Sequence, residues 1–403
     1  MSDEVDVTAP IASDVVVLRW AEIFLKGANR PYFEQALVDQ VVRLCRPIAG
    51  VKIHRAHARL LVEVPRADLG RAVECLSRLF GLHSMSPARM CPRDVDAIAE
   101  IAVDLTREAL ARRGGGKPRF KIDTNRPDKS FPLSSIDVSR KVGARVQREF
   151  DLPVDVHKPE LTVGVEIGHK GRIFAFTETL PGPGGLPVGA SGRVNLMISG
   201  GIDSPVAGWL AMKRGCTLMA TYFHSFPFTG DQTREKVVEL VRRLAEWHGP
   251  IPLHVVHFTE VQKQLRETGP AELAVVLYRR MMVRTAAIIA EREGALALVT
   301  GDNLAQVASQ TLENLTATED ASPMPVLRPL LTYDKLETVA LAQKIGTYET
   351  SILPYDDCCS LFLPAHPATK ARAKDARWFE RDMEVDRLAA EMAEKAERVI
   401  VKP

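Results

Sequence analysis

The chain has 403 residues, a length that favours two or three domains over a single core. Apolar residues make up 46% and charged residues 26%. No uncharged apolar run of about 18 residues is present, which excludes a membrane-spanning helix. The formal net charge is only +2, and the first residues, MSDEVDVTAP, lack the basic and apolar parts of a signal peptide. We therefore expect a cytoplasmic globular protein, and its overall charge indicates no particular class of binding partner.

The first predicted domain covers residues 14–84 and is small. Its pattern gives a strand, a helix, a β-hairpin and a second helix, an order typical of a ferredoxin-like α+β unit. The hairpin is indicated by the alternating sequence VKIHRAHARLLVEV. The expected strands and helices cover residues 15–20, 32–45, 51–64 and 68–79.

The second predicted domain covers residues 85–180 and contains a segment that is rich in basic residues. From Arg107 to Arg148 there are twelve Lys and Arg against four Asp and Glu, a local excess of +8. Such an excess indicates a binding surface for a polyanion, although an ordinary solvated face explains the same composition. Helices are expected over 95–113 and 135–150. The second of these helices has an apolar stripe formed by Val138, Val142 and Val146.

A change of pattern follows the sequence LPGPGGLPVGASG, which predicts a linker over residues 181–192. From residue 193 to 403, short apolar strands alternate with longer helices, which predicts a doubly wound parallel sheet and an α/β fold class. Ligands of such sheets bind at the carboxyl ends of the strands. The expected strands and helices cover residues 194–198, 205–213, 217–223, 231–247, 253–258, 277–292 and 295–300.

The sequence SGGIDSPVAG, which begins at Ser199, connects the first of these strands to its helix. It lacks the GxGxxG pattern of dinucleotide-binding proteins and the GxxxxGK[ST] pattern of Walker P-loops. Its glycines still allow backbone N–H groups to surround an anion at a helix N-terminus, and Asp203 is suited to hold Mg²⁺ against phosphates. A plain turn, in which Ser204 caps a helix that starts at Pro205, explains the bare SGG equally well.

The motif SGGxDS after a buried strand resembles the PP-loop of the ATP pyrophosphatases, which split ATP into AMP and pyrophosphate while they adenylate a substrate. The longer stretch LMISGGIDSPVAGWLAMKRG resembles one family of these enzymes, the tRNA 4-thiouridine synthetases, also called tRNA uridine 4-sulfurtransferases or thiamine-biosynthesis sulfur-transfer proteins. The region Met85–Thr179 resembles the RNA-binding THUMP domain. Other similar segments are RWAEIFLKGANRPYFE, TGDNLAQVASQTLENL, RPLLTYDKLE and CCSLFLPAHPATKA. The resemblance covers nearly the whole chain in the same order.

The resemblance implies that ATP, with Mg²⁺, adenylates the uracil oxygen, so that AMP becomes the leaving group. Asp203 and Lys335 are the implied catalytic residues of this step, since a cation at Lys335 stabilises charge that develops at the α-phosphate. No metal-ligating cluster is expected. The implied ATP contacts lie at strand ends, in the PP-loop and at three later positions. They are Met197, Ile198, Ser199, Gly200, Gly201, Asp203, Ser204, Tyr222, Phe223, Arg279, Gly301 and Gln310.

Six cysteines are present without a CxxC pair, which argues against a metal cluster and against a disulfide framework. Cys358 and Cys359 stand apart, because their polar, proline-flanked surroundings predict an accessible loop. The resemblance implies that one of them carries a persulfide. The match to HPATKA favours Cys359, with Cys358 as a resolving thiol. The rhodanese domain of some members has no counterpart here, so we expect sulfur from a cysteine desulfurase or another carrier, and a role in thiamine synthesis stays open.

The resemblance also implies that tRNA is the substrate, that the two N-terminal domains grip its acceptor arm, and that the protein is a homodimer. Basic side chains that contact phosphates would position the RNA without reading its sequence. The candidate tRNA contacts are Arg112, Arg113, Lys117, Arg119, Lys121, Arg126, Lys129, Lys141 and Arg145.

Two other functions remain open at this point. A PP-loop ATP pyrophosphatase that modifies tRNA differently, or that amidates a small molecule, needs neither the basic region nor Cys359. An RNA-binding protein with a vestigial nucleotide site would have a degraded PP-loop, whereas every residue of the motif is present here.

Overall fold

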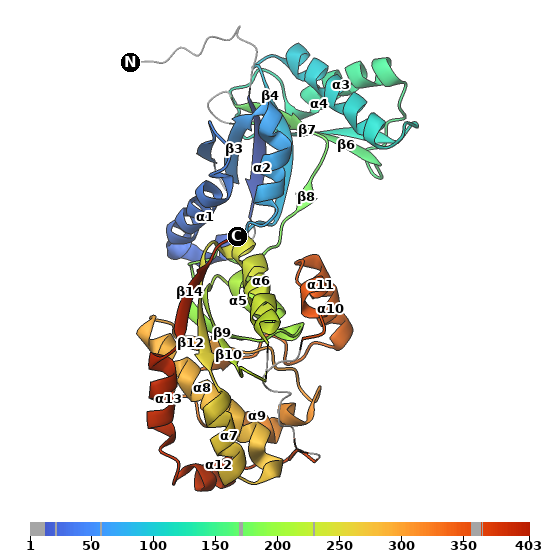
Figure 1. Ribbon diagram of the computed structural model, residues 1–403. Coiled ribbons are helices and arrows are strands. Elements are labelled where there is room, and N and C mark those ends of the chain that lie inside the picture. Colours follow the sequence, from blue (N-terminus) through green and yellow to red (C-terminus); the bar gives the residue numbers. More distant parts are fainter. Residues whose placement is uncertain are drawn as a thin grey trace, which may run out of the picture. The chain divides into compact units, whose positions relative to one another are not determined.

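The computed structural model describes residues 13–20, 22–56, 59–168, 172–228, 230–355, 364 and 366–403. The chain divides into two compact units, one that ends at Gly185 and one that begins at Leu186 (Figure 1). Among the helices of the described residues, none is both long enough and apolar enough to cross a bilayer.

One continuous sheet of eight described strands runs through the first unit, where the sequence predicts two separate domains. Its order is β2-β3-β1-β4-β7-β6-β5, and β8 pairs with β4 off this path. The two parts share the sheet because β4 pairs antiparallel with β1 along one edge and with β7 along the other. The strands are β1 (Ser13–Arg19), β2 (Lys52–Ala56), β3 (Arg59–Pro65), β4 (Ser84–Cys91), β5 (Phe120–Asn125), β6 (Leu161–Ile167), β7 (Ile173–Phe176) and β8 (Leu180–Pro181).

The helices of the first unit bury their apolar faces in two separate cores. The stripe predicted at Val138, Val142 and Val146 is fully buried, which confirms the prediction. Two of these helices begin where a side chain caps them, since Asp94 accepts a hydrogen bond from the Ala97 N–H and Ser134 from the Asp137 N–H. The α-helices are α1 (Arg30–Cys45), α2 (Leu69–Leu76), α3 (Val95–Arg112) and α4 (Ser135–Phe150), and the 3₁₀ helices are η1 (Glu22–Asn29) and η2 (Arg66–Asp68).

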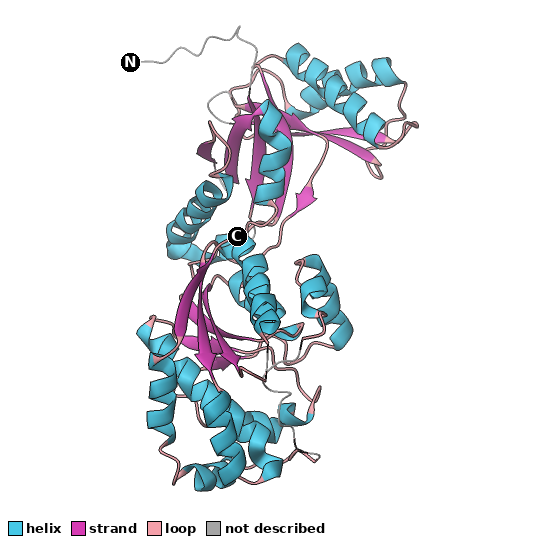
Figure 2. Ribbon diagram, in the orientation of Figure 1, coloured by secondary structure: helices cyan, strands magenta, loops and turns pink. Residues whose placement is uncertain are grey.

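The second unit has the predicted parallel sheet, with helices on both faces (Figure 2). Six strands of the described chain follow the order β13-β12-β9-β10-β11-β14, and all pair in parallel except β14. The strands are β9 (Arg193–Ile198), β10 (Thr217–His224), β11 (Ile251–His257), β12 (Ala297–Val299), β13 (Val326–Leu327) and β14 (Glu397–Val401). The helices are α5 (Asp203–Lys213), α6 (Asp231–His248), α7 (Thr259–Thr268), η4 (Ala271–Leu273), α8 (Ala274–Arg292), η5 (Ala308–Gln310), α9 (Leu312–Glu319), α10 (Lys335–Lys344), α11 (Tyr348–Ser351), α12 (Ala373–Glu380) and α13 (Val385–Glu394).

The amphipathic pattern of residues 379–399 predicts a helix over this stretch, and that prediction is wrong for its last part. The structure instead has the short helices α12 and α13 and then strand β14, which pairs antiparallel with β11. Val399, Ile400 and Val401 are β-branched, and such residues favour a strand where a sheet edge is available.

A buried ion cluster joins α12 to α8. The Glu380 carboxylate accepts two hydrogen bonds from Arg280, at 2.7 and 2.8 Å, and two from Arg284, at 2.8 and 2.7 Å. Arg280 is fully buried, and its guanidinium also donates to the Asp320 carboxylate at 3.1 Å. Burial would raise the pKa of Glu380, but the two arginines outweigh it and hold that pKa below its usual value.

Removing this carboxylate is therefore expected to destabilise the second unit. Glu380→Ala leaves the buried guanidinium of Arg280 and the partly buried one of Arg284 without their main partner, which costs about 3–5 kcal/mol of the free energy of unfolding. The exposed pair of Glu391 and Arg387 offers a matched control, since Glu391→Ala should cost less than about 1 kcal/mol. Urea denaturation at pH 7 measures both variants, and equal midpoints would contradict the prediction.

The pH dependence of the same variant tests whether the stabilisation comes from the ionised form of Glu380. A carboxyl group with a lowered folded pKa stabilises the protein above its unfolded pKa of about 4.3, and this contribution is lost as the pH falls through the folded value. The difference in unfolding free energy between wild type and Glu380→Ala should therefore be full at pH 7 and shrink below about pH 4.

Candidate active site

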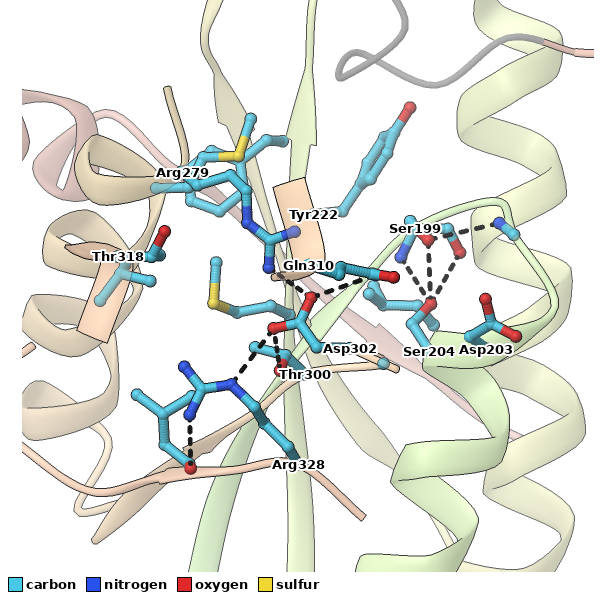
Figure 3. Close-up of a pocket in the computed structure, with 18 residues that line it drawn as sticks. Ser199, Asp203, Ser204, Tyr222, Arg279, Thr300, Asp302, Gln310, Thr318 and Arg328 are labelled. Atoms are coloured by element: carbon cyan, nitrogen blue, oxygen red, sulfur yellow. Dashed lines mark hydrogen bonds and ion pairs between the residues drawn. The ribbon is translucent and has the colours of Figure 1, made fainter. Parts of the chain in front are cut away.

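A cavity of about 220 Å³ lies at the carboxyl ends of β9, β10 and β12 (Figure 3). Every residue predicted as an ATP contact lines it except Gly200, which lies in the turn between two lining residues. Apolar side chains suited to a purine ring also line the cavity; they are Met197, Phe223, Met282, Val283 and Val326. The structure thus brings together in one place residues that span more than a hundred positions of sequence.

The turn after β9 is built around the hydroxyls of Ser199 and Ser204. The Ser204 hydroxyl accepts a hydrogen bond from the Ser199 N–H at 2.9 Å and lies 3.1 Å from the Ser199 hydroxyl. Helix α5 begins at Asp203, and the residue before it, Ile202, has no side chain that can cap a helix. The reading in which Ser204 caps a helix that starts at Pro205 is therefore wrong. An uncapped helix N-terminus that opens into a cavity is suited to bind an anion.

Gly301 is required because the end of β12 passes very close to this turn. A Cβ atom at Gly301 would lie 2.6 Å from the Ser204 nitrogen and 2.8 Å from the Asp203 carbonyl carbon, both of which belong to the backbone. Backbone atoms cannot move aside as a flexible side chain does. Glycine at this position therefore allows β12 and the start of α5 to form one wall of the cavity.

The structure places Lys335 against Asp203, although 131 residues separate them in the chain. Lys335 is the first residue of α10, and its Nζ lies 2.8 Å from Asp203 Oδ1. The second carboxylate oxygen, Oδ2, accepts a hydrogen bond from the Gln306 amide at 3.0 Å. Gln306 is not among the residues predicted from the sequence, where its only signal is its place in the segment TGDNLAQVASQ.

A buried carboxylate, Asp302, organises the rest of the cavity (Figure 3). Arg279 donates a hydrogen bond to it, and Arg328 Nε forms an ion pair with it at 3.4 Å. The Thr300 hydroxyl donates at 2.8 Å and the Gln310 amide at 3.4 Å. Burial alone would raise the pKa of this carboxyl group, but the two arginines and the hydroxyl outweigh it and lower the pKa.

Asp302 and Arg328 were not among the predicted site residues. Both follow strand ends, since Asp302 comes shortly after β12 and Arg328 directly after β13. That position is the signal by which sequence reasoning could have found them. With them, the cavity holds a stably ionised carboxylate between two guanidinium groups.

The predicted sulfur carriers, Cys358 and Cys359, lie outside the described residues. Of the other cysteines, Cys45, Cys91 and Cys216 are buried. Burial raises the pKa of Cys45 and of Cys91 to about 12, and it also raises the pKa of Cys216. A thiol with so high a pKa is a poor nucleophile at neutral pH. Those three cysteines are therefore core residues rather than candidate nucleophiles.

The candidate tRNA contacts differ in their partners within the protein: some form ion pairs, some bind backbone carbonyls, and some do neither. Lys117 is paired with Asp151, Arg119 with Asp155 and Glu160, and Arg145 with Glu100 and Glu149. Arg113 and Arg126 donate to backbone carbonyls. Across the described part of the chain, the four remaining predicted contacts have neither a side-chain ion pair nor a side-chain hydrogen bond to the protein: Arg112, Lys121, Lys129 and Lys141. The structure thus leaves a smaller set of cations for phosphates than the sequence count indicates.

A parallel sheet, a glycine turn that leads to a helix N-terminus, and a cavity at the strand ends define a nucleotide-binding domain of the PP-loop class. Comparison with family models agrees with this class. The model of the family Thiamine biosynthesis protein (ThiI) matches residues 189–385, that of the ThiI ferredoxin-like domain residues 15–86, and that of the THUMP domain residues 92–172.

The chain belongs to the tRNA sulfurtransferase family. It is 43% identical to a probable tRNA sulfurtransferase of Caldanaerobacter subterraneus subsp. tengcongensis, over 92% of this chain and 96% of that protein. It is 41% identical to a probable tRNA sulfurtransferase of Halothermothrix orenii, over 96% and 99% of the two chains. A crystal structure of a 4-thiouridine synthetase in complex with RNA and bound ATP has a TM-score of 0.88 and 35% identity, covering 96% of this chain and all of the other.

The Asp302 cluster gives a direct prediction for nucleotide binding. Asp302→Asn keeps the shape of the side chain but removes the charge that fixes two guanidinium groups, so the affinity for ATP should fall at least about tenfold. Asp320→Asn is the matched control, because Asp320 also pairs with buried Arg280 but does not line the cavity. Isothermal titration with ATP measures both variants. Unchanged affinity of Asp302→Asn would contradict the role assigned to this carboxylate.

Proposed function

We propose that this protein is an ATP-dependent tRNA sulfurtransferase that forms 4-thiouridine at the eighth nucleotide of tRNA. The observation that carries the proposal is the cavity in which the PP-loop, the Asp203–Lys335 pair and the Asp302 cluster meet. The family and the RNA-bound and ATP-bound structural relative support it.

The chemistry explains why an ATP site and a tRNA surface belong to one protein. Oxide is a poor leaving group, so the uracil oxygen O4 is first activated: O4 attacks the α-phosphorus of ATP, the bond to the bridging oxygen breaks, and pyrophosphate leaves. The turn from Ser199 to Ser204 would hold the departing pyrophosphate through its N–H groups and hydroxyls. Lys335 would stabilise the charge that develops at the α-phosphate.

The second step replaces the activated oxygen by sulfur. The terminal sulfur of a persulfide on Cys359 attacks C4, and AMP leaves with the original oxygen. A second thiol, Cys358 or an external one, then attacks the carrier sulfur of Cys359 and releases 4-thiouridine, leaving a disulfide that an external thiol reduces. Which of the two cysteines carries the persulfide is decided by the variants below.

Asp203 is the residue that would hold Mg²⁺. Magnesium in nucleotide sites commonly binds one or two carboxylates together with phosphate oxygens, so one carboxylate at the start of α5 fits this ion. Among the described residues, no cluster of three or more His, Cys, Asp or Glu side chains forms a dedicated metal site. Mg²⁺ bound here would neutralise charge on the phosphates. Because Lys335 and Gln306 already contact both oxygens of Asp203, the ion would share that carboxylate with them.

The remaining partners follow from the same proposal. A ferredoxin-like domain at 14–84 and a THUMP domain at 85–180 would bind the acceptor arm of tRNA. A linker at 181–192, in which the boundary between the two compact units falls, would join them to the PP-loop domain at 193–403. Sulfur would come from a cysteine desulfurase, the active form would be a homodimer, and a second role in thiamine synthesis would draw on the same persulfide.

The two steps can be separated with single variants. Asp203→Ala and Lys335→Ala should each abolish formation of adenylated tRNA, because they remove the charges beside the phosphates. Cys359→Ser should leave adenylation intact and abolish 4-thiouridine, with Cys216→Ala as a control for loss of a buried thiol. The assay contains unmodified tRNA, Mg²⁺-ATP, cysteine and a desulfurase. Full thiolation by Cys359→Ser would assign the carrier role to Cys358, and no thiolation by wild type would reject the function.

Binding of tRNA tests the basic surface. Arg112→Ala and Lys141→Ala each remove a cation that has no ion pair in the protein. The slope of log K against log salt concentration is negative, and each variant should make it less steep by about 0.7–0.9. Arg145→Ala is the control, since its guanidinium already binds Glu100 and Glu149 and should alter the slope less. Filter binding at several KCl concentrations gives the slopes. Unchanged slopes for the first two variants would reject this surface as the phosphate contact.

A further inference from the structure

The hydroxyl of Thr318 is buried at the wall of the nucleotide cavity. Thr318 lies in α9, lines the cavity and is 2% exposed. Across the described residues, its Oγ1 atom has no hydrogen-bond partner. Buried polar groups in proteins are nearly always hydrogen-bonded, because removing them from water without a new partner is costly. A hydroxyl left without a partner beside a cavity indicates a contact that forms when a ligand is bound.

Two other buried threonines show what a purely structural hydroxyl does in a helix. The Thr106 hydroxyl in α3 donates to the Ala102 carbonyl at 2.7 Å. The Thr285 hydroxyl in α8 donates to the Met281 carbonyl at 3.0 Å. Both threonines are fully buried, and this bond to the backbone of their own helix satisfies the hydroxyl without any ligand. Thr318 does not make such a bond, and its side chain lines the cavity instead.

The position of Thr318 favours a contact with the base of ATP rather than with its phosphates. The glycine turn and the start of α5 supply the anion donors of the cavity. Figure 3 shows Thr318 on the opposite side of the cavity from Ser199 and Asp203. Helix α8 packs against α9 and contributes Met282 and Val283 to the lining, apolar side chains that suit a purine ring.

The chemistry of the neighbouring side chains determines which group of the base Thr318 can contact. Arg279 and Arg328 also lie on this side of the cavity, and both contact Asp302 (Figure 3). A guanidinium group has hydrogen-bond donors and no acceptor, whereas a hydroxyl accepts as well as donates. Among the described side chains of α8 and α9 that line the cavity, the Thr318 hydroxyl is therefore the oxygen that can accept a hydrogen bond from the 6-amino group of adenine.

We propose that the Thr318 hydroxyl accepts a hydrogen bond from the 6-amino group of adenine and so selects ATP by its base. The inference rests on the proposed function, in which ATP is the nucleotide bound. It assigns Thr318 a role in recognising the base and none in the chemistry at the phosphates. A site built to pair with a polar group of its ligand rejects an analogue that lacks this group, because the polar atom of the site then stays unpaired.

The wild-type protein tests the inference with two nucleotides. Purine riboside triphosphate has a hydrogen atom in place of the 6-amino group of ATP and is otherwise identical. Isothermal titration without tRNA should show that ATP binds about tenfold more tightly than this analogue. Equal affinities for the two nucleotides would overturn the inference.

Variants of Thr318 assign the preference to the hydroxyl. Thr318→Val keeps the shape of the side chain and removes the hydroxyl. It should weaken ATP binding about tenfold and leave binding of the analogue within about twofold of wild type, so that the preference disappears. Thr318→Ser keeps the hydroxyl and should keep the preference. Thr318→Ala removes the hydroxyl as well and gives the same readout if Thr318→Val folds poorly.

The melting temperature without nucleotide separates a binding role from a structural one. Thr318→Val removes a buried hydroxyl that has no partner, so the free protein should melt at the wild-type temperature or above it. Thr285→Val is the matched control in α8. It loses the hydrogen bond to Met281, so it should melt at a lower temperature while it keeps the wild-type preference for ATP.

The contrary outcomes are distinct. If Thr318→Val weakens the binding of ATP and of the analogue by the same factor, or keeps the wild-type preference, the inference is overturned. A wild-type protein that binds neither nucleotide would instead reject the ATP site of the proposed function.

Discussion

The buried carboxylate of Asp302 is the interaction on which the nucleotide cavity depends. Two guanidinium groups, from Arg279 and Arg328, contact this same carboxylate in a largely buried site, where like charges repel more strongly than they do in bulk water. Asp302 fixes both side chains, and Arg328 also pairs with the exposed carboxylate of Glu319 at 2.5 Å. The Asp302 carboxylate also holds Gln310 and Thr300. Side chains from α8, from η5 and from the ends of β12 and β13 therefore all contact this one carboxylate.

A lysine from a distant helix lies beside the glycine turn after β9, whereas a Walker loop carries a lysine in its own sequence. Lys335 reaches Asp203 from the start of α10, while Arg279 and Arg328 approach from α8 and from the end of β13. The glycine turn can then remain short, with N–H groups and hydroxyls as its anion donors. This arrangement suits a reaction in which pyrophosphate is retained at the turn and the α-phosphate is left accessible to a nucleobase.

The sequence predicted those features that depend on local pattern, and the structure supplied those that depend on long-range contact. The alternation of strands and helices and the burial of Val146 and its neighbours follow from periodicity, whereas the PP-loop was identified by its resemblance to a known motif. Local pattern does not reveal ion pairs such as Arg145 with Glu100, which are 45 residues apart and remove cations from the basic surface. Strand β14 depends in the same way on the free edge of β11, which exists only once the sheet has formed.

The proposed first step is the cleavage of ATP between the α- and β-phosphates, which adenylates tRNA. It is tested most directly by incubating the enzyme with unmodified tRNA and with ATP labelled at either the α- or the γ-phosphorus, in the absence of a sulfur donor. If ATP is cleaved at this bond, the α-label becomes attached to tRNA while the γ-label leaves as pyrophosphate. Release of ADP, or transfer of the γ-label to tRNA, would contradict it.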